Sequence, residues 1–248
     1  IMTIIKYELM RYFLSPLAYV YLISFLLLSG SLAIYFGHFF MDGKANLWGL
    51  FDYQPWIYLL FIPGIAMRSW SEEFKSKSII QLLTLPVSLS DIVWGKFLAS
   101  WCFAILAISL TFPFWITANI YGNPDNTVIF IGYIGCFILS GAMLAISQTM
   151  SATTKNPVIA LVLAVFVNLL FFWGSFEYVL FWARELFSET IVDTIISFSF
   201  WIRFFSLSRG LVELRDLVFF GSLIVFFNVL TMFIVGLKTK GNSSIISS

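Results

Sequence analysis

The chain has 248 residues, of which 60% are hydrophobic and only 11% are charged, and its formal net charge is +1. Soluble domains carry about 25% charged residues, so this composition excludes an ordinary soluble domain and indicates a membrane protein. The near-neutral charge gives no indication of nucleic-acid binding. The two cysteines lie inside apolar runs, where packing is expected rather than a disulfide bond or a metal site.

Long uncharged stretches predict an all-α polytopic membrane protein with six transmembrane helices. Apolar runs of about 20 residues are typical of helical spans, and these runs are too long and too continuous for barrel strands. The expected spans cover about residues 16–36, 48–67, 92–119, 127–150, 157–176 and 216–237. Pro55 and Pro63 would bend the second span, and Pro113 predicts a kink in the third.

The first residues predict a short interfacial helix before the first span. Ile5, Leu9 and Tyr12 recur at helical spacing, and the charged residues between them lie away from that line. Ser15 and Pro16 then fit the N-cap and the first turn of the first span. Ahead of the last span, a segment rich in both aromatic and charged residues favours short helices at the outer surface.

The distribution of Lys and Arg predicts that both termini are cytoplasmic. Six spans place both termini on one side, and short loops on the cytoplasmic side carry an excess of Lys and Arg. With the termini inside, nine such residues are internal: Lys6, Arg11, Arg68, Lys75, Lys77, Lys96, Lys155, Lys238 and Lys240. The short outer loops contribute only Lys44. Arginines in the long outer segment count less, because long segments weigh little in this rule.

No motif in the chain indicates chemistry of its own. Proton coupling or intramembrane catalysis requires ionisable groups at depth, and none of the expected spans has Asp, Glu, Lys or Arg near its middle. The single histidine, His38, is expected at the outer end of the first span. Metalloprotease, nucleophile-elbow and phosphate-loop patterns are missing from the sequence. We therefore expect no enzyme and no catalytic, cofactor or metal site in this chain.

A few polar and small residues inside the spans predict how the helices pack. Gln148, Asn168 and Asn228 are expected to form interhelical hydrogen bonds, with a role in lining a substrate path as the alternative. A small-residue stripe that includes Gly141 and Thr149 predicts close helix packing, either within one subunit or between two.

The connection between the second and third spans, residues 68–96, concentrates seven charged side chains. As one straight helix it would place the aromatic residues before Ser76 and the apolar residues after Ser78 on opposite sides. A break between these serines resolves the conflict and leaves a separate short helix. Ser88 and Asp91 then resemble a capping box for the third span. This short helix either packs on its own chain or the lipid headgroups, or docks into another protein.

Three stretches carry a resemblance to a known family: "KYELMRYFLSPLAYVYLISFLLLSG", "PGIAMRSWSEEFKSKSIIQLLTLPVSLSDIVWGKFLAS" and "SLSRGLVELRDLVFFGSLIVFF". They resemble the permease subunits of type-2 ATP-binding-cassette (ABC) exporters, especially the branch that contains the gliding-motility permease. The family commonly has Gly-Thr and then Glu before the "LLT" run, where this chain has Lys77-Ser78 and Ile80.

The resemblance implies that residues 1–248 form one permease domain of an exporter in a bacterial inner membrane. The implied partners are two ATP-binding-cassette subunits, which would bind ATP and Mg²⁺, and a second permease subunit, identical or related. The charged connection would be the coupling helix that contacts the ATPase, through Glu72, Glu73, Phe74, Lys77, Ile79, Leu82 and Leu83. Charges before the last span would shape an outer gate: Arg209, Glu213, Arg215 and Asp216.

Two other classes of function stay open from the sequence. A non-transporting scaffold that anchors an envelope assembly would also lack chemistry and could use the same docking helix. A self-contained secondary carrier is disfavoured by the uncharged spans. The identity of a transported substrate does not follow from the sequence.

Overall fold

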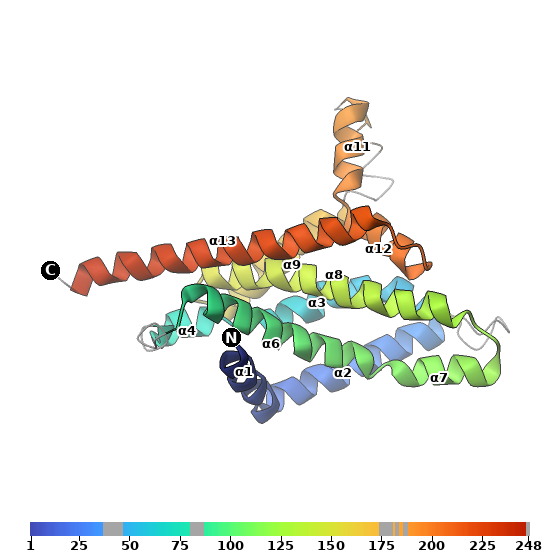
Figure 1. Cartoon of the computed structure of the whole chain (residues 1–248), viewed down its shortest axis with the longest axis horizontal. Coiled ribbons are helices and arrows are strands. Elements are labelled where there is room, and N and C mark those ends of the chain that lie inside the picture. The colour runs from blue at the N-terminus through green and yellow to red at the C-terminus, as the bar shows by residue number, and fades with distance from the viewer. Residues whose placement is uncertain (37–46, 80–86, 174–180, 182–183, 186–187, 247–248) are drawn as a thin grey trace.

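A computed structural model describes residues 1–36, 47–79, 87–173, 181, 184–185 and 188–246, and each element in Figure 1 is a helix. The helices are α1 (Met2–Leu14), α2 (Pro16–Tyr35), α3 (Trp48–Ala66), α4 (Ser71–Ser76), α6 (Leu89–Ser109), α7 (Phe112–Tyr121), α8 (Asn126–Thr153), α9 (Pro157–Trp173), α11 (Glu189–Ser197), α12 (Phe200–Ser208) and α13 (Leu214–Ile246).

Four helical stretches in the described parts are long and apolar enough to cross a membrane. They are Pro16–Tyr35, Leu89–Tyr121, Asn126–Thr153 and Leu214–Thr239. The described part of α9 is apolar but shorter. Helix α3 is not among the four, because Asp52, Gln54 and two prolines lower its hydropathy. The prediction of a multi-pass helical membrane protein is therefore confirmed, whereas six spans remain a prediction.

The helix boundaries follow local signals in the sequence. Helix α2 begins at Pro16 after Ser15, as expected, although the Ser15 side chain makes no capping hydrogen bond. Helices α6 and α7 are separated at Leu110 and Thr111, directly before the expected kink at Pro113. Helix α13 continues to Ile246, beyond the expected end near residue 237, because no proline interrupts it.

Helix α8 lies at the centre of the bundle and contacts α3, α6, α9, α12 and α13 (Figure 1). In its most apolar window 72% of the residues are buried. The expected small-residue stripe faces neighbouring helices of this same chain. A Cβ atom at Gly141 would lie 2.9 Å from the Trp101 ring of α6, and the Thr149 hydroxyl donates to the Phe227 carbonyl oxygen of α13 at 2.9 Å. The stripe therefore serves packing within one subunit.

Three polar residues inside the helices are predicted to form interhelical hydrogen bonds, and two of them do. The Gln148 amide donates to the Ser100 hydroxyl of α6 at 3.2 Å, and the Asn168 amide of α9 donates to the Ser147 hydroxyl of α8 at 3.1 Å. Asn228 differs, because its amide nitrogen donates to the Ile224 carbonyl of its own helix.

The helices place distant segments together at two ends of the bundle (Figure 1). One end holds α4, the start of α6, the end of α8 and the C-terminal part of α13, with α1 beside them. The opposite end holds α7 and α12, and α11 stands away from the bundle. The start of α1 and the end of α13 therefore lie toward the end that carries α4.

Candidate functional site

The turn that leads into α4 is fixed by one hydroxyl group of α8. The Ser151 hydroxyl accepts hydrogen bonds from the backbone N–H groups of Trp70 and Ser71, at 3.1 and 3.2 Å. It also donates to the Met67 carbonyl oxygen at 2.9 Å. The first N–H groups of a helix lack partners within the helix, so Ser151 supplies what the start of α4 needs. Helix α4 is thereby tied to the end of the central helix.

Helix α4 ends at Ser76 and is followed by Lys77, whose backbone is left-handed with φ of 60°. This turn is the break that the sequence predicts between Ser76 and Ser78. It brings Phe74 and Ile79 into one buried cluster with Ile92 and Val235. The apolar residues on either side of the turn thus share one core, although a single straight helix would separate them.

The C-terminal helix closes this cluster with a lysine. The Lys238 ammonium lies 4.7 Å from the centre of the Phe74 ring and donates to the carbonyl oxygens of Ala152 and Thr153, at 2.7 and 2.6 Å. These are carbonyl groups at the end of α8, where helix carbonyls lack partners. Lys238 therefore joins α13, α8 and α4.

A buried lysine connects α6 to both α1 and α4. Lys96 is only 1% exposed, and its ammonium donates to Glu8 Oε1 at 2.9 Å, to the Ser69 carbonyl oxygen at 3.2 Å and to Glu73 Oε1. The three N–H donors of a lysine ammonium are thus all used. Its nitrogen also lies 5.1 Å from the centre of the Trp70 ring. A buried charge without such partners would be strongly unfavourable.

Two carboxylates share this one ammonium. The guanidinium group of Arg11 lies close by, at 3.8 Å from Glu8 and 3.7 Å from Glu73, so a second positive charge faces the pair. Burial raises the pKa of the Glu73 carboxyl above its ordinary value, although the neighbouring Lys96 lowers it in part. Within the described residues, Glu73 Oε2 is buried without a hydrogen-bond partner. The stability of this cluster therefore depends on the charge of each of its members, Glu8, Arg11, Glu73 and Lys96.

A second polar chain attaches α1 to the bundle. The Tyr12 hydroxyl donates to the Ile65 carbonyl oxygen of α3 at 3.3 Å and lies 3.0 Å from the Ser100 hydroxyl of α6. Burial raises the pKa of Tyr12 to about 12, so the hydroxyl stays protonated at physiological pH. Because Gln148 donates to the same Ser100 hydroxyl, this chain connects α1 to α8.

The residues predicted to contact an ATPase fall into two groups. Glu73, Phe74 and Ile79 are buried inside this chain, where they hold α4 and the following turn. Glu72 is partly exposed and Lys77 is exposed, as is their neighbour Lys75. Leu82 and Leu83 lie outside the described residues. The free surface of α4 is therefore charged.

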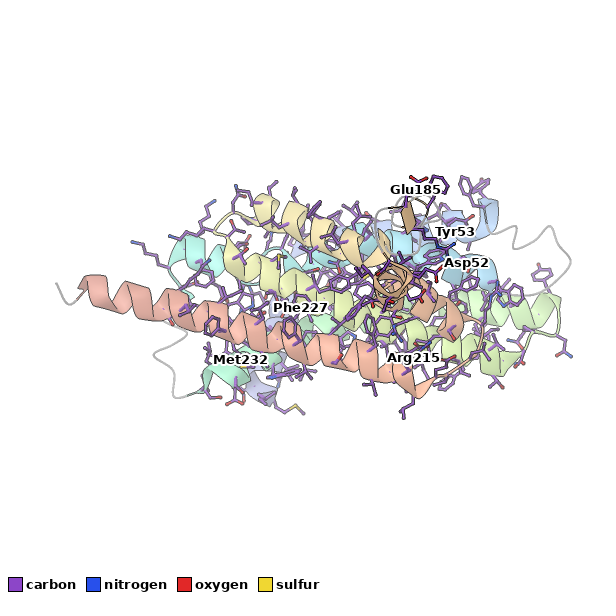
Figure 2. The ribbon with its side chains drawn as sticks, turned by 90° about the horizontal axis from the view of Figure 1, so that it is seen from above. Asp52, Tyr53, Glu185, Arg215, Phe227 and Met232 are labelled. Carbon is purple, nitrogen blue, oxygen red and sulfur yellow. The ribbon has the colours of Figure 1, made fainter. Side chains whose placement is uncertain are left out.

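The four residues predicted to shape an outer gate do not converge on one point. Asp216 is 2% exposed and accepts a hydrogen bond from Arg203 at 2.7 Å. Arg209 stacks on the Phe205 ring, 3.9 Å from its centre. Glu213 and Arg215 form an exposed ion pair of 3.3 Å at the start of α13, where Figure 2 shows Arg215. These charges form local pairs and ring contacts.

Several functional candidates were missed from the sequence: Glu8, Arg11, Lys96, Ser151, Arg203 and Lys238. For Glu8 a signal exists, because Ile4, Glu8 and Tyr12 lie on one helical line at spacing of four. A carboxylate between two apolar residues on one face indicates a buried partner. Ser151 gave no comparable signal, since serine is common in membrane helices.

These elements define a helical membrane component with a charged, rigidly held segment at one end. In agreement, the family model described as "ABC-2 family transporter protein" matches residues 57–245. The chain belongs to this family and is thus a permease component of an ABC transporter. A search of curated proteins gave no significant match.

Proposed function

We propose that the chain is the membrane subunit of a type-2 ABC exporter of the gliding-motility permease-like branch. Two separate ATP-binding-cassette subunits, which bind ATP and Mg²⁺, drive it, and a second permease subunit completes the membrane part. The transporter lies in a bacterial inner membrane, with six spans and both termini in the cytoplasm. Its family membership supports the class of protein, and the resemblance of its three stretches supports the branch.

The observation that carries the proposal is the way α4 is held. A segment that receives force from an ATPase has to transmit it to the spans rather than bend. Lys96 joins α4 to α1 and α6, and Ser151 joins it to α8, so a displacement of α4 acts on several helices at once. The partner contacts the partly exposed Glu72 and the exposed Lys75 and Lys77, within the coupling segment 71–85.

The outer end of the chain responds to this movement. Arg203 of α12 and Asp216 of α13 form a buried pair, and Arg209 stacks on the ring of Phe205. Tilting α13 separates or closes these contacts, which makes them the outer gate. Arg209, Glu213, Arg215 and Asp216 act there on the position of α12 and α13 rather than by binding substrate.

The test uses co-expression with an ATP-binding-cassette subunit from the same genome, purification of the complex and reconstitution into lipid vesicles. We expect the wild-type chain to co-purify with the ATPase and to change its rate of ATP hydrolysis. The double variant Lys75→Glu and Lys77→Glu inverts two exposed charges without touching the buried cluster. It should insert and melt normally but lose co-purification and the effect on ATP hydrolysis.

The matched control is Arg215→Glu, which inverts an exposed charge at the opposite end of the bundle. This variant should keep full association with the ATPase. If the Lys75 and Lys77 variant associates and couples as well as wild type, α4 is not the contact. If the chain binds the ATPase without altering hydrolysis in any vesicle, the scaffold interpretation replaces transport.

A further inference from the structure

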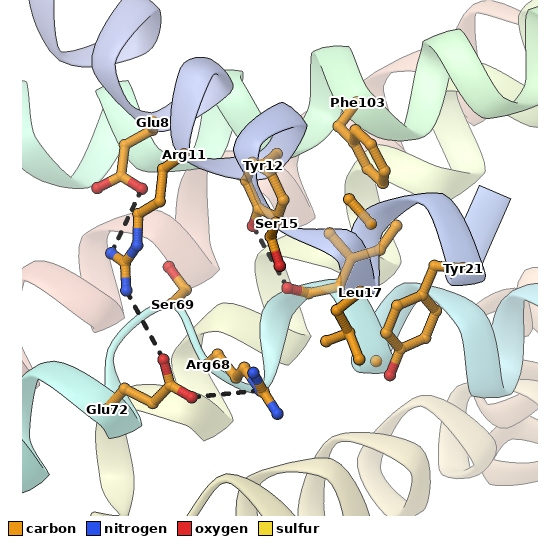
Figure 3. A pocket seen from close by; sticks show the side chains of 13 residues that line it. Glu8, Arg11, Tyr12, Ser15, Leu17, Tyr21, Arg68, Ser69, Glu72 and Phe103 are labelled. Carbon is orange, nitrogen blue, oxygen red and sulfur yellow. Dashed lines mark hydrogen bonds and ion pairs between the residues drawn. The ribbon is translucent and has the colours of Figure 1, made fainter.

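A small cavity lies where α1 turns into α2 and both meet the end of α3 (Figure 3). Its volume is about 120 Å³. Charged side chains line one part of the wall, and apolar or aromatic side chains line the other. The charged part includes Glu8, Arg11, Arg68 and Glu72. Two positive and two negative groups therefore face one small space.

The two arginines have unused hydrogen-bonding capacity. Arg11 lies 3.7–3.8 Å from the carboxylates of Glu8, Glu72 and Glu73, which is beyond ordinary hydrogen-bond distance. Arg68 contacts Glu72 through its Nε atom at 3.2 Å. The side chains of Arg11 and Arg68 are 45% and 48% exposed. A guanidinium group has five N–H donors, and its fork matches the oxygen atoms of a phosphate.

Hydroxyl groups complete a polar lining beside an apolar wall. Ser15 and Tyr21 both line the cavity, and among the described residues their hydroxyls have no hydrogen-bond partner. Tyr21 reaches this position because Gly64 has no side chain, since a Cβ atom there would lie 2.8 Å from the tyrosine ring. Leu17 and Phe103 supply the apolar wall.

The depth of the cavity follows from the start of α2. Helix α2 is a candidate membrane span that begins at Pro16, and Ser15 and Leu17 line the cavity. The cavity therefore lies at the boundary between the span and the surrounding water, where lipid headgroups are found. Arginine and tyrosine side chains are typical of that boundary.

We propose that this cavity binds the headgroup of a zwitterionic phospholipid with a primary ammonium group, as in phosphatidylethanolamine. The phosphodiester lies between the guanidinium groups of Arg11 and Arg68, and the ammonium donates to the carboxylates of Glu72 and Glu8. The cavity presents two positive and two negative groups, which matches a zwitterionic headgroup. An anionic headgroup carries no ammonium group to pair with the two carboxylates, so we expect it to bind less tightly. A trimethylammonium group has no N–H to donate, so a choline headgroup fits less well. The proposal rests only on the membrane location, not on transport.

The test measures lipid binding by the purified full chain in detergent with native mass spectrometry. Short-chain phosphatidylethanolamine, phosphatidylglycerol and phosphatidylcholine are titrated separately, and glycerophosphoethanolamine and inorganic phosphate serve as headgroup probes without acyl chains. We expect phosphatidylethanolamine to bind about tenfold more tightly than the other two lipids, the factor that one charge-assisted hydrogen bond gives. Glycerophosphoethanolamine should bind more weakly than the lipid, and phosphate more weakly still.

Three variants test the residues. Glu72→Gln should abolish the preference for phosphatidylethanolamine, because it removes a carboxylate that accepts from the ammonium. Arg68→Gln should weaken the binding of all three lipids, because the phosphodiester that it contacts is common to them. Tyr21→Phe, which removes only a hydroxyl, should weaken lipid binding without lowering the melting temperature. Arg215→Gln, an exposed arginine at the opposite end of the bundle, should leave the preference intact. Equal or tighter binding of phosphatidylglycerol would overturn the proposal in favour of a plain anion site. An undiminished preference in Glu72→Gln, or undiminished lipid binding in Arg68→Gln, would also overturn it.

Discussion

Lys96 donates a hydrogen bond of 2.9 Å to Glu8, a residue 88 positions earlier in the chain. The contact joins the amphipathic N-terminal helix to the start of a membrane span, and Glu73 joins α4 to the same ammonium. Three segments that are distant in sequence thus depend on one buried charge. Loss of that charge should therefore destabilise the packing of all three segments.

Lys96→Met should lower the free energy of unfolding by about 3–5 kcal/mol, because the two buried carboxylates lose the ammonium that they share and its hydrogen bonds. The measurement is the melting temperature of the purified chain in detergent. Lys155→Met, a change at an exposed lysine, is the control and should leave the melting temperature nearly unchanged.

The defect of Lys96→Met should depend on pH in a definite direction. Burial already raises the pKa of the Glu73 carboxyl in the wild-type chain, and removal of Lys96 raises it further. The folded state then binds a proton more tightly than the unfolded state, so stability rises as pH falls from the raised pKa toward the ordinary value of a glutamate. The variant should therefore recover part of its melting temperature under mildly acidic conditions. A defect that grows on acidification would contradict the charge assignment.

Ser151→Ala should loosen α4 while the spans stay intact. The variant removes three hydrogen bonds to backbone groups of residues 67–71, each worth about 0.5–1.5 kcal/mol net. In this variant, backbone hydrogen exchange in residues 70–76 should be faster than in the wild-type chain. Exchange in the middle of α3 should stay the same. Thr153→Ala is the matched control, because the Thr153 hydroxyl donates to the Met150 carbonyl of its own helix. Equal exchange in the two variants would contradict the role given to Ser151.

Features set by neighbouring residues could be predicted from the sequence. The start of α2 at Pro16 and the turn at Lys77 both follow from local rules of backbone geometry and side-chain facing. The N-cap at Ser88 is of the same kind, because its hydroxyl accepts the Asp91 N–H at 3.1 Å. Such features need no knowledge of the remaining chain.

Features set by distant residues could not be predicted. The spacing of Glu8 indicates a buried partner, but neither segment alone identifies Lys96 as that partner, because the contact depends on α1 lying against α6. The pairing of Arg203 with Asp216 is of the same kind, because the two residues lie on different helices separated by a turn. The burial of Glu73 likewise depends on the position of Lys96 in α6, because the Glu73 carboxylate accepts a hydrogen bond from its ammonium.

Asp216→Asn should destabilise the end of the bundle opposite α4 by about 3–5 kcal/mol, because Arg203 would stay buried without a carboxylate. Arg203 would keep its hydrogen bond to the Ser197 carbonyl oxygen and its contact with the Phe219 ring, so the fold should persist with a lower melting temperature. In the reconstituted transporter, we expect altered transport of substrate with association of the ATPase unchanged.

Arg215→Gln is the control for the stability effect of Asp216→Asn, because Arg215 and Glu213 are exposed, and exposed ion pairs are worth about 0–1 kcal/mol. Arg209→Gln should have an intermediate effect through loss of its contact with the Phe205 ring. Unchanged assembly and transport in both Asp216→Asn and Arg209→Gln would remove these residues from the outer gate.

Gly141→Ala should disturb the contact between α8 and α6. The new Cβ atom would lie 2.9 Å from Trp101 Cε2, which is closer than real Cβ contacts allow, so the indole has to move. That movement weakens the hydrogen bond from Trp101 Nε1 to the Phe137 carbonyl oxygen, now 2.9 Å long. Overpacking of this kind costs about 1–3 kcal/mol. The melting temperature should fall, and the tryptophan fluorescence should shift.

Gly221→Ala in α13 is the matched control, because nothing lies within 4 Å of the Cβ position there. Alanine favours a helix over glycine by about 1 kcal/mol, so this variant should be neutral or slightly more stable. The contrast separates a steric requirement from a general effect of glycine in a helix. If both variants melted alike, and Gly141→Ala instead changed only the association of two permease subunits, the small-residue stripe would belong to an interface between subunits.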